Sequence, residues 1–158
     1  MSSADSILTQ LQTSALGHAI SKSHHLVGAG LQIVHVVAFM LLLASLVLIS
    51  LRLLGLAFRH QPLQHVARDA TRLIWLGLAL TIISGSLMFI ASPKLYFHNS
   101  AFALKMLLLL AAVFVQLTLV RKVAHSTMPH AVFTRASVSI ALLLWFGVAF
   151  AGRIIGFI

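Results

Sequence analysis

The chain has no cysteine and only two acidic residues, Asp5 and Asp69, among its 158 residues. Without thiols it cannot form a disulfide, a thiolate metal site, an iron–sulfur cluster or a covalent haem attachment. Charged residues make up 8% of the chain, whereas a typical soluble domain has about 25%, so too few are present for a water-exposed surface. These shortages predict an integral membrane protein with a single domain.

The basic residues give a net charge of +9, yet they fall in short groups between apolar runs. They do not form one patch interleaved with aromatic residues, so we expect no nucleic-acid partner. Positive charges beside apolar runs set membrane topology and contact lipid headgroups. The partner that this distribution predicts is the lipid bilayer.

Four apolar runs are long enough to cross a bilayer, which takes about 20 residues. We predict spans near 26–54, 72–92, 101–121 and 136–157. The segment 1–23 lacks the pattern of a signal peptide and predicts a short interfacial helix, broken near Gly17. The polar connector 55–72 contains Pro62 as a breaker, followed by a short amphipathic helix. A second basic connector, 121–135, contains Pro129 as its breaker.

Spans joined by connectors of this length predict an all-α fold, an antiparallel four-transmembrane-helix bundle. The connectors after spans one and three hold seven basic residues: Arg52, Arg59, Arg68, Arg72, Arg121, Lys122 and Arg135. The other side holds four: Lys22, Lys94, Lys105 and Arg153. Because basic residues stay in the cytoplasm, we expect a bacterial inner-membrane protein with both termini on the periplasmic or exterior side.

Several polar groups fall in the outer half of this predicted bundle. His35 lies roughly 13 Å below the outer end of span one, with Gln32 on the same helical face. Lys105 and Arg153 lie within one or two turns of the outer ends of spans three and four. Tyr96 and Asn99 belong to the outer loop. Ionisable residues in a span cost about 3 kcal/mol at its centre, so they indicate function by default.

Each group also has a purely structural interpretation. Lys105 and Arg153 are close enough to helix ends to extend to the headgroups. Gln32 could bond a neighbouring helix, and His35 could be a neutral ring that bonds across the bundle. Met88 and Met106, at comparable depth, fill gaps in cores more often than they ligate metals.

The two cations have no acidic residue nearby in the sequence, so they need an anionic partner. A bound anion, a lipid phosphate or the propionates of haem would fit. We therefore predict that His35, Lys105 and Arg153 act on one shared ligand in the outer leaflet.

The same residues carry a resemblance to a family. The chain is similar to a domain-of-unknown-function family of small four-helix bacterial inner-membrane proteins. The similarity lies in three segments: QIVHVVAF with LLLASLVLISLRLLGL, TRLIWLGLALTIISGSLMF, and YFHNSAFALKMLLLLAA. The resemblance covers roughly residues 14–120, with Ser50 where an acidic residue is common and Ser84 where Thr is usual. It implies fold and topology and no activity. A looser likeness, to the membrane part of copper-resistance D-type proteins, rests on helix number and His and Met content.

Three functions are compatible with these residues. The favoured one is binding of b-type haem for electron transfer, with His35 as axial ligand and Lys105 and Arg153 on the propionates. The second axial ligand would be Met88, Met106, His98 or His35 of a second copy. Copper handling by His35, Met88 and Met106 is an alternative, since neutral His and thioethers suit Cu(I).

The third function is that of an accessory or structural subunit of a membrane complex, without a cofactor. Gly152 and Gly156 form a small-xxx-small pair that suits packing within the bundle or between two copies. No set of nucleophile, base and acid can be assembled from the sequence, which argues against an enzyme.

Overall fold

The computed structural model describes residues 3–22, 25–58, 60–120 and 131–157. These ranges form helices joined by short turns and contain no strand, which confirms the all-α prediction. Four helices are long and apolar enough to cross a membrane, which indicates a multi-pass membrane protein. They are α3 (His25–Leu53), α4 (Leu63–Ala91), α6 (Ser100–Val115), which continues into the π-helical turn η1 (Gln116–Val120), and α8 (Ala131–Ile154).

α4 is longer than the predicted second span because no turn separates the span from the amphipathic stretch before it. Pro62 stands just before the first residue of the helix, where its ring interrupts nothing. Ala67 and Ala70 are buried in the same core as Ile49 of α3. Packing against α3 therefore holds the polar first turns of α4 in the same helix as the apolar span.

α8 begins at Ala131, before the predicted 136. The sequence predicts that the connector ends at Arg135, whose side chain is exposed. Thr134 and Val138, four residues apart, are both buried. The inward face of the helix thus starts before the arginine. Most of the predicted connector 121–135, including Pro129, lies outside the described residues.

The N-terminal segment forms two short helices, α1 (Ser3–Thr13) and α2 (Ala15–Lys22). The break between them is at Ser14, three residues before Gly17, near which the sequence predicted it. The Ser14 hydroxyl accepts a hydrogen bond from the Gly17 N–H at 3.2 Å and so caps α2. A Cβ at Gly17 would lie 2.7 Å from the backbone oxygens of Leu11 and Gln12. Gly17 thus permits the tight contact of α2 with the end of α1.

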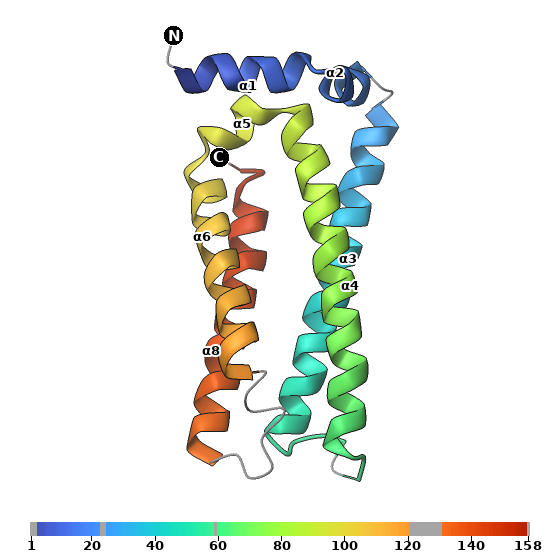
Figure 1. Ribbon diagram of the computed structural model, residues 1–158, viewed down its shortest axis with the longest axis vertical. Helices are drawn as coiled ribbons and strands as arrows, with labels where there is room; N and C mark the ends of the chain where they lie inside the picture. Colours follow the sequence, from blue (N-terminus) through green and yellow to red (C-terminus); the bar gives the residue numbers. More distant parts are fainter. Residues whose placement is uncertain (1–2, 23–24, 59, 121–130, 158) are drawn as a thin grey trace.

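The long helices pack in two pairs, α3 with α4 and α6 with α8, as Figure 1 shows. α3 also contacts α8, which joins the pairs. α1 lies across one end of the four helices, close to the short helix α5 (Pro93–Phe97) that connects α4 to α6 (Figure 1). These three short helices, α1, α2 and α5, cover the end of the molecule that carries the polar residues of interest.

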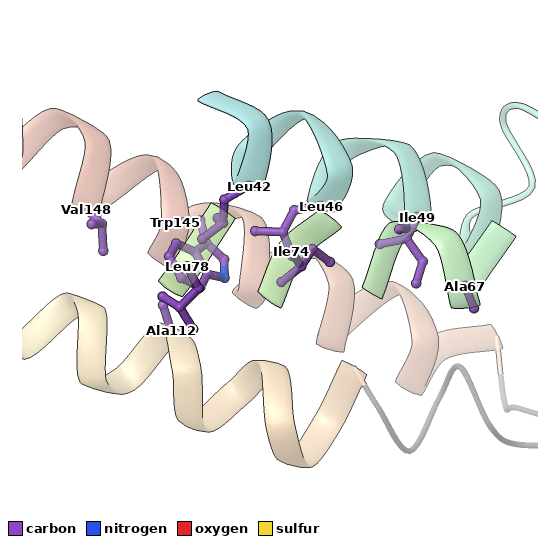
Figure 2. Packing of buried hydrophobic residues seen from close by; sticks show 10 residues of the cluster. Leu42, Leu46, Ile49, Ala67, Ile74, Leu78, Ala112, Trp145 and Val148 are labelled. Carbon is purple, nitrogen blue, oxygen red and sulfur yellow. The ribbon is translucent and has the colours of Figure 1, made fainter. Parts of the chain in front are cut away.

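The core lies between the two pairs and is centred on Trp145 of α8, whose side chain is 1% exposed. Figure 2 shows its indole beside Leu42 and Leu78, with Ala112 of α6 on its other side. The Trp145 ring also lies 6.2 Å from that of Phe39 on α3. Trp145 therefore shares one hydrophobic cluster with side chains from all three other long helices.

Candidate functional site

His35 is half-buried and lies roughly 15 Å along α3 from its first residue. Its Nδ1 is 3.0 Å from the hydroxyl oxygen of Ser84 on α4. Its Nε2 is 3.5 Å from the ammonium nitrogen of Lys105 on α6. Both ring nitrogens therefore contact protein groups from other helices, so the imidazole of His35 faces α4 and α6. We call His35, Ser84 and Lys105 the polar node.

Ser84 determines which nitrogen of the ring carries the proton. Its hydroxyl donates to the backbone carbonyl of Leu80 at 2.6 Å, so its single proton is committed there. Towards Nδ1 of His35 the hydroxyl can then only accept, which places the proton on Nδ1. This leaves the lone pair of Nε2 free to accept a hydrogen bond from Lys105.

The contact between Lys105 and His35 is at the long end of hydrogen-bond distances, so it is a weak bond that can be exchanged. The side chain of Lys105 is half-buried, and it passes beside Gly152 on α8. A Cβ at Gly152 would lie 3.3 Å from the Lys105 nitrogen. Gly85, on α4, makes room in the same way for the ring of His35, whose Cε1 is 3.0 Å from the position of a Cβ there.

All four long helices therefore meet at the node: α3 supplies His35, α4 Ser84 and Gly85, α6 Lys105, and α8 Gly152. The sequence indicated His35 and Lys105 by their depth. It did not reveal the role of Ser84, which is a common residue in membrane helices, or of the two glycines beside the polar side chains. The feature of the sequence that could have indicated this part of the site is the dipeptide Ser84-Gly85, in which a small polar residue stands beside a residue without a side chain.

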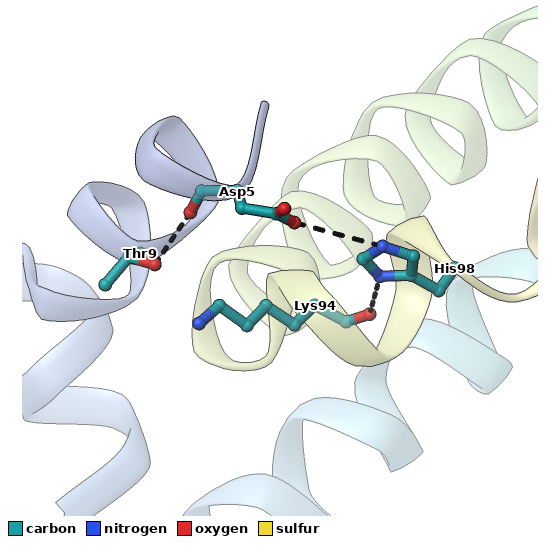
Figure 3. Close-up of polar contacts among 4 residues, drawn as sticks. All are labelled: Asp5, Thr9, Lys94 and His98. Atoms are coloured by element: carbon teal, nitrogen blue, oxygen red, sulfur yellow. Dashed lines mark hydrogen bonds and ion pairs between the residues drawn. The ribbon is translucent and has the colours of Figure 1, made fainter. Parts of the chain in front are cut away.

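No carboxylate in the described part of the chain lies within ion-pair distance of Lys105. Asp69 is exposed on α4, near the other end of the molecule. Asp5, on α1, is 4.0 Å from Nε2 of His98 (Figure 3). Nδ1 of His98 in turn donates to the carbonyl of Lys94, so this histidine, a suggested axial ligand, is held at the surface.

Arg153 follows Gly152, but its side chain is exposed and does not join the node. Its guanidinium carbon lies 4.8 Å above the ring centroid of Phe157, a cation–π contact. The structure thus brings together two of the three residues predicted to share a ligand, His35 and Lys105.

Tyr96 and Asn99 lie just above the node, in the segment that covers it. The Tyr96 ring packs against Phe89 and Phe102, with centroids 6.3 and 5.5 Å away, and burial raises the pKa of its phenol. The side-chain oxygen of Asn99 accepts bonds from the N–H groups of Ala101 and Phe102, which caps α6. Its amide nitrogen donates to the carbonyl of Ile155 at 3.4 Å and so fastens α6 to the end of α8.

The remaining predicted residues make no hydrogen bond to the node within the described ranges. Gln32 is exposed, and Met106 is 40% exposed on the outside of α6. Met88 is half-buried on α4, four residues after Ser84. Within the described ranges, no group of three or more His, Cys, Asp or Glu side chains is placed to hold a metal ion.

These features define the class of the molecule: a helical multi-pass membrane protein with a polar node among four apolar helices. The profile of a family of unknown function, DUF6644, matches residues 8–158, and the chain belongs to this family. The predicted resemblance to an uncharacterised family is confirmed, and the match extends beyond the 14–120 expected to include the fourth span. No curated protein and no solved structure matches the chain.

Proposed function

We propose that the chain is an antiparallel four-span protein of the bacterial inner membrane, with both termini on the periplasmic side. The charge distribution of the sequence supports this orientation, since seven of its eleven basic residues fall in or beside the connectors after spans one and three. Fusion of a reporter that is active only in the cytoplasm to the C-terminus should give no activity. Strong activity there would reverse the orientation.

We propose further that the polar node binds an amphipathic molecule through its acidic group. The observation that carries this proposal is the pairing of the Lys105 ammonium with a neutral imidazole and with no carboxylate of the described chain. An ammonium has three donors, and a charge inside a membrane is costly unless it is paired. An incoming anion supplies the missing charge and takes the donors that His35 leaves free.

The position of the node defines the ligand more closely. It lies inside the spans and beneath a cover of short helices, so the ligand needs an apolar body with its acidic group at the depth of Lys105. A lipid phosphodiester and a haem propionate both have this chemistry. The two sources differ in their absorption, which allows the same protein preparation to distinguish them.

The first test measures binding of dioctanoylphosphatidylglycerol to the purified protein in a neutral detergent, with dioctanoylglycerol as the uncharged comparison. Lys105→Met keeps the apolar stem and removes the charge. We expect it to weaken binding about 10- to 100-fold, the value of one charge-assisted hydrogen bond. Lys94→Met is the matched control, because Lys94 is exposed at the same end of the molecule. Equal binding by Lys105→Met and the parent would contradict the proposal.

Haem b is the second candidate, and the observation in its favour is an interior histidine beside a cation that suits a propionate. Iron would take Nε2 of His35, so Lys105 would have to leave that nitrogen for the propionate. An absorption spectrum of the protein purified from its native membrane tests this. A Soret band that His35→Ala removes supports haem, and copper bound at one ion per chain without such a band supports copper handling.

The accessory function makes a different prediction for the same experiments. If the node serves only to hold the helices together within a larger membrane complex or homo-oligomer, the protein will bind neither the acidic lipid nor a cofactor. Lys105→Met would then lower stability and change nothing else.

A further inference from the structure

We infer that binding of an acidic ligand at Lys105 is coupled to the uptake of a proton by His35. This inference rests on the proposed function and adds a regulation to it: the node takes the ligand more tightly as the pH falls. The argument follows from the direction of the hydrogen bonds in the node.

The first step concerns the free protein, in which the node carries one positive charge. Ser84 commits its proton to Leu80, so His35 donates from Nδ1 and is neutral, while Lys105 donates to Nε2. A second proton on the ring has no place to bind, because the lone pair of Nε2 is in use. It would also set two like charges 3.5 Å apart.

The second step concerns the bound state. An acidic group that takes the Lys105 ammonium removes the donor from Nε2 and leaves a lone pair without a partner inside the protein, which is unfavourable. A proton from bulk water on the outer side can then bind Nε2. It places an N–H beside the negative charge of the ligand, and the bond from Nδ1 to Ser84 stays as it was. No bond between heavy atoms forms or breaks.

The third step is linkage. Because the anion favours the proton on His35, the proton must favour the anion by the same factor. The surroundings add no competing acid: Ser84 and Gly85 of α4 and Gly152 of α8 do not titrate. The other charged or titratable groups at this end include Asp5, His18, Lys94, Tyr96, His98 and Arg153.

Those outer groups are not expected to produce the effect. Tyr96 stays a neutral phenol over the pH range of interest, since burial raises its pKa. Asp5 and His98 pair with each other at the surface, and Arg153 lies over Phe157. His98, an exposed histidine at the same end of the molecule, provides the control.

The experiment is calorimetric titration of the full chain, in a neutral detergent, with dioctanoylphosphatidylglycerol. This probe keeps one negative charge over the whole pH range, so any pH dependence comes from the protein. We expect the dissociation constant to fall at least about threefold from about pH 8 to about pH 5.5, where histidines titrate. Titrations in two buffers of different ionisation enthalpy should show net proton uptake of up to about one per ligand.

His35→Gln is the decisive variant, because its side-chain oxygen can accept from Lys105 and does not titrate. It should bind the probe with no pH dependence and no proton uptake. If it fails to fold, His35→Asn serves the same purpose. His98→Gln is the matched control and should keep the dependence of the parent. A parent that binds equally at both pH values without proton uptake overturns the coupling and leaves the proposed function intact. A parent that does not bind the probe at either pH also overturns the coupling. If it carries haem, the proposed function stands, because iron and not a proton would then occupy Nε2 of His35. If it carries no haem, the proposed function is overturned as well.

Discussion

Nε2 of His35 accepts a hydrogen bond from the ammonium group of Lys105 at 3.5 Å, across 70 positions of the sequence. The contact joins the α3–α4 pair to the α6–α8 pair. Apart from it and the packing around Trp145, these pairs meet mainly where α3 touches α8. The node is therefore placed where a change in its charge or ligand would act on the relation between two halves of the bundle.

The first prediction compares two hydroxyl groups of α4. Ser84→Ala removes the acceptor of the His35 N–H, and we expect it to lower the free energy of unfolding by about 1–3 kcal/mol. Thr81 has a buried hydroxyl oxygen without a partner among the described residues, so Thr81→Val should be neutral or slightly stabilising. Denaturant titration in mixed micelles measures both. Equal losses for the two variants would show that the Ser84 bond contributes nothing of its own.

The second prediction concerns the contact of α3 with α4. A Cβ at Gly77 would lie 2.9 Å from the backbone nitrogen of Leu42 and from the carbonyl oxygen of Ala38. Backbone atoms cannot move aside as the end of a side chain can, so Gly77→Ala should cost about 1–3 kcal/mol or more. Gly28 has nothing within 4 Å, and Gly28→Ala should be neutral or stabilise by up to about 1 kcal/mol. Thermal unfolding of both variants tests this, and a stable Gly77→Ala would mean that the two helices can separate freely.

Much of the fold was predictable because apolar runs of this length have few alternatives. The boundaries of the helices were less predictable, because they depend on packing between helices that the sequence does not display. Arg72 and Arg135 were interpreted as the ends of connectors, yet α4 and α8 begin before them because Ala67, Ala70 and Thr134 are buried.

The sequence predicted how far along each helix the site residues lie. It did not predict in which direction around the helix axis each side chain points. His35 and Lys105 were expected at one depth and do meet. Arg153 was expected with them, but the residue that approaches Lys105 is its neighbour Gly152. One position along a helix turns the side chain by about 100°, and this directs Arg153 out towards Phe157. Only the packing of α8 on α6 determines which of the two adjacent residues faces inward.

The third prediction concerns the cap that closes the outer end of α6. Asn99→Ala removes two bonds to backbone N–H groups and the bond to Ile155, so it should cost about 1–2 kcal/mol. Ser92→Ala is the matched control, because Ser92 stands at the same position before α5 and makes no side-chain cap bond. Hydrogen exchange of the first turn of α6 should accelerate in Asn99→Ala alone. Unchanged exchange there would mean that Asn99 does not hold this helix end.

The fourth prediction uses Tyr96, the only tyrosine in the chain, so that phenolate absorbance reports this residue alone. Its ring packs against Phe89 and Phe102, which also stack on each other, and burial disfavours the charged phenolate and raises the pKa. The midpoint of a spectroscopic titration should therefore lie above the value of roughly 10 for a free tyrosine. Because the folded state prefers the neutral phenol, the stabilisation from this group is complete below the pKa of the unfolded chain. It is lost as the pH rises through the higher pKa of the folded protein.

Phe89→Ala opens one side of this aromatic cluster, so it should shift the Tyr96 midpoint down towards that of free tyrosine. Phe97→Ala is the control: Phe97 follows Tyr96, but its ring is exposed and lies against His98. It should leave the midpoint where it is. A parent midpoint no higher than that of free tyrosine in the same detergent would mean that water reaches the phenol.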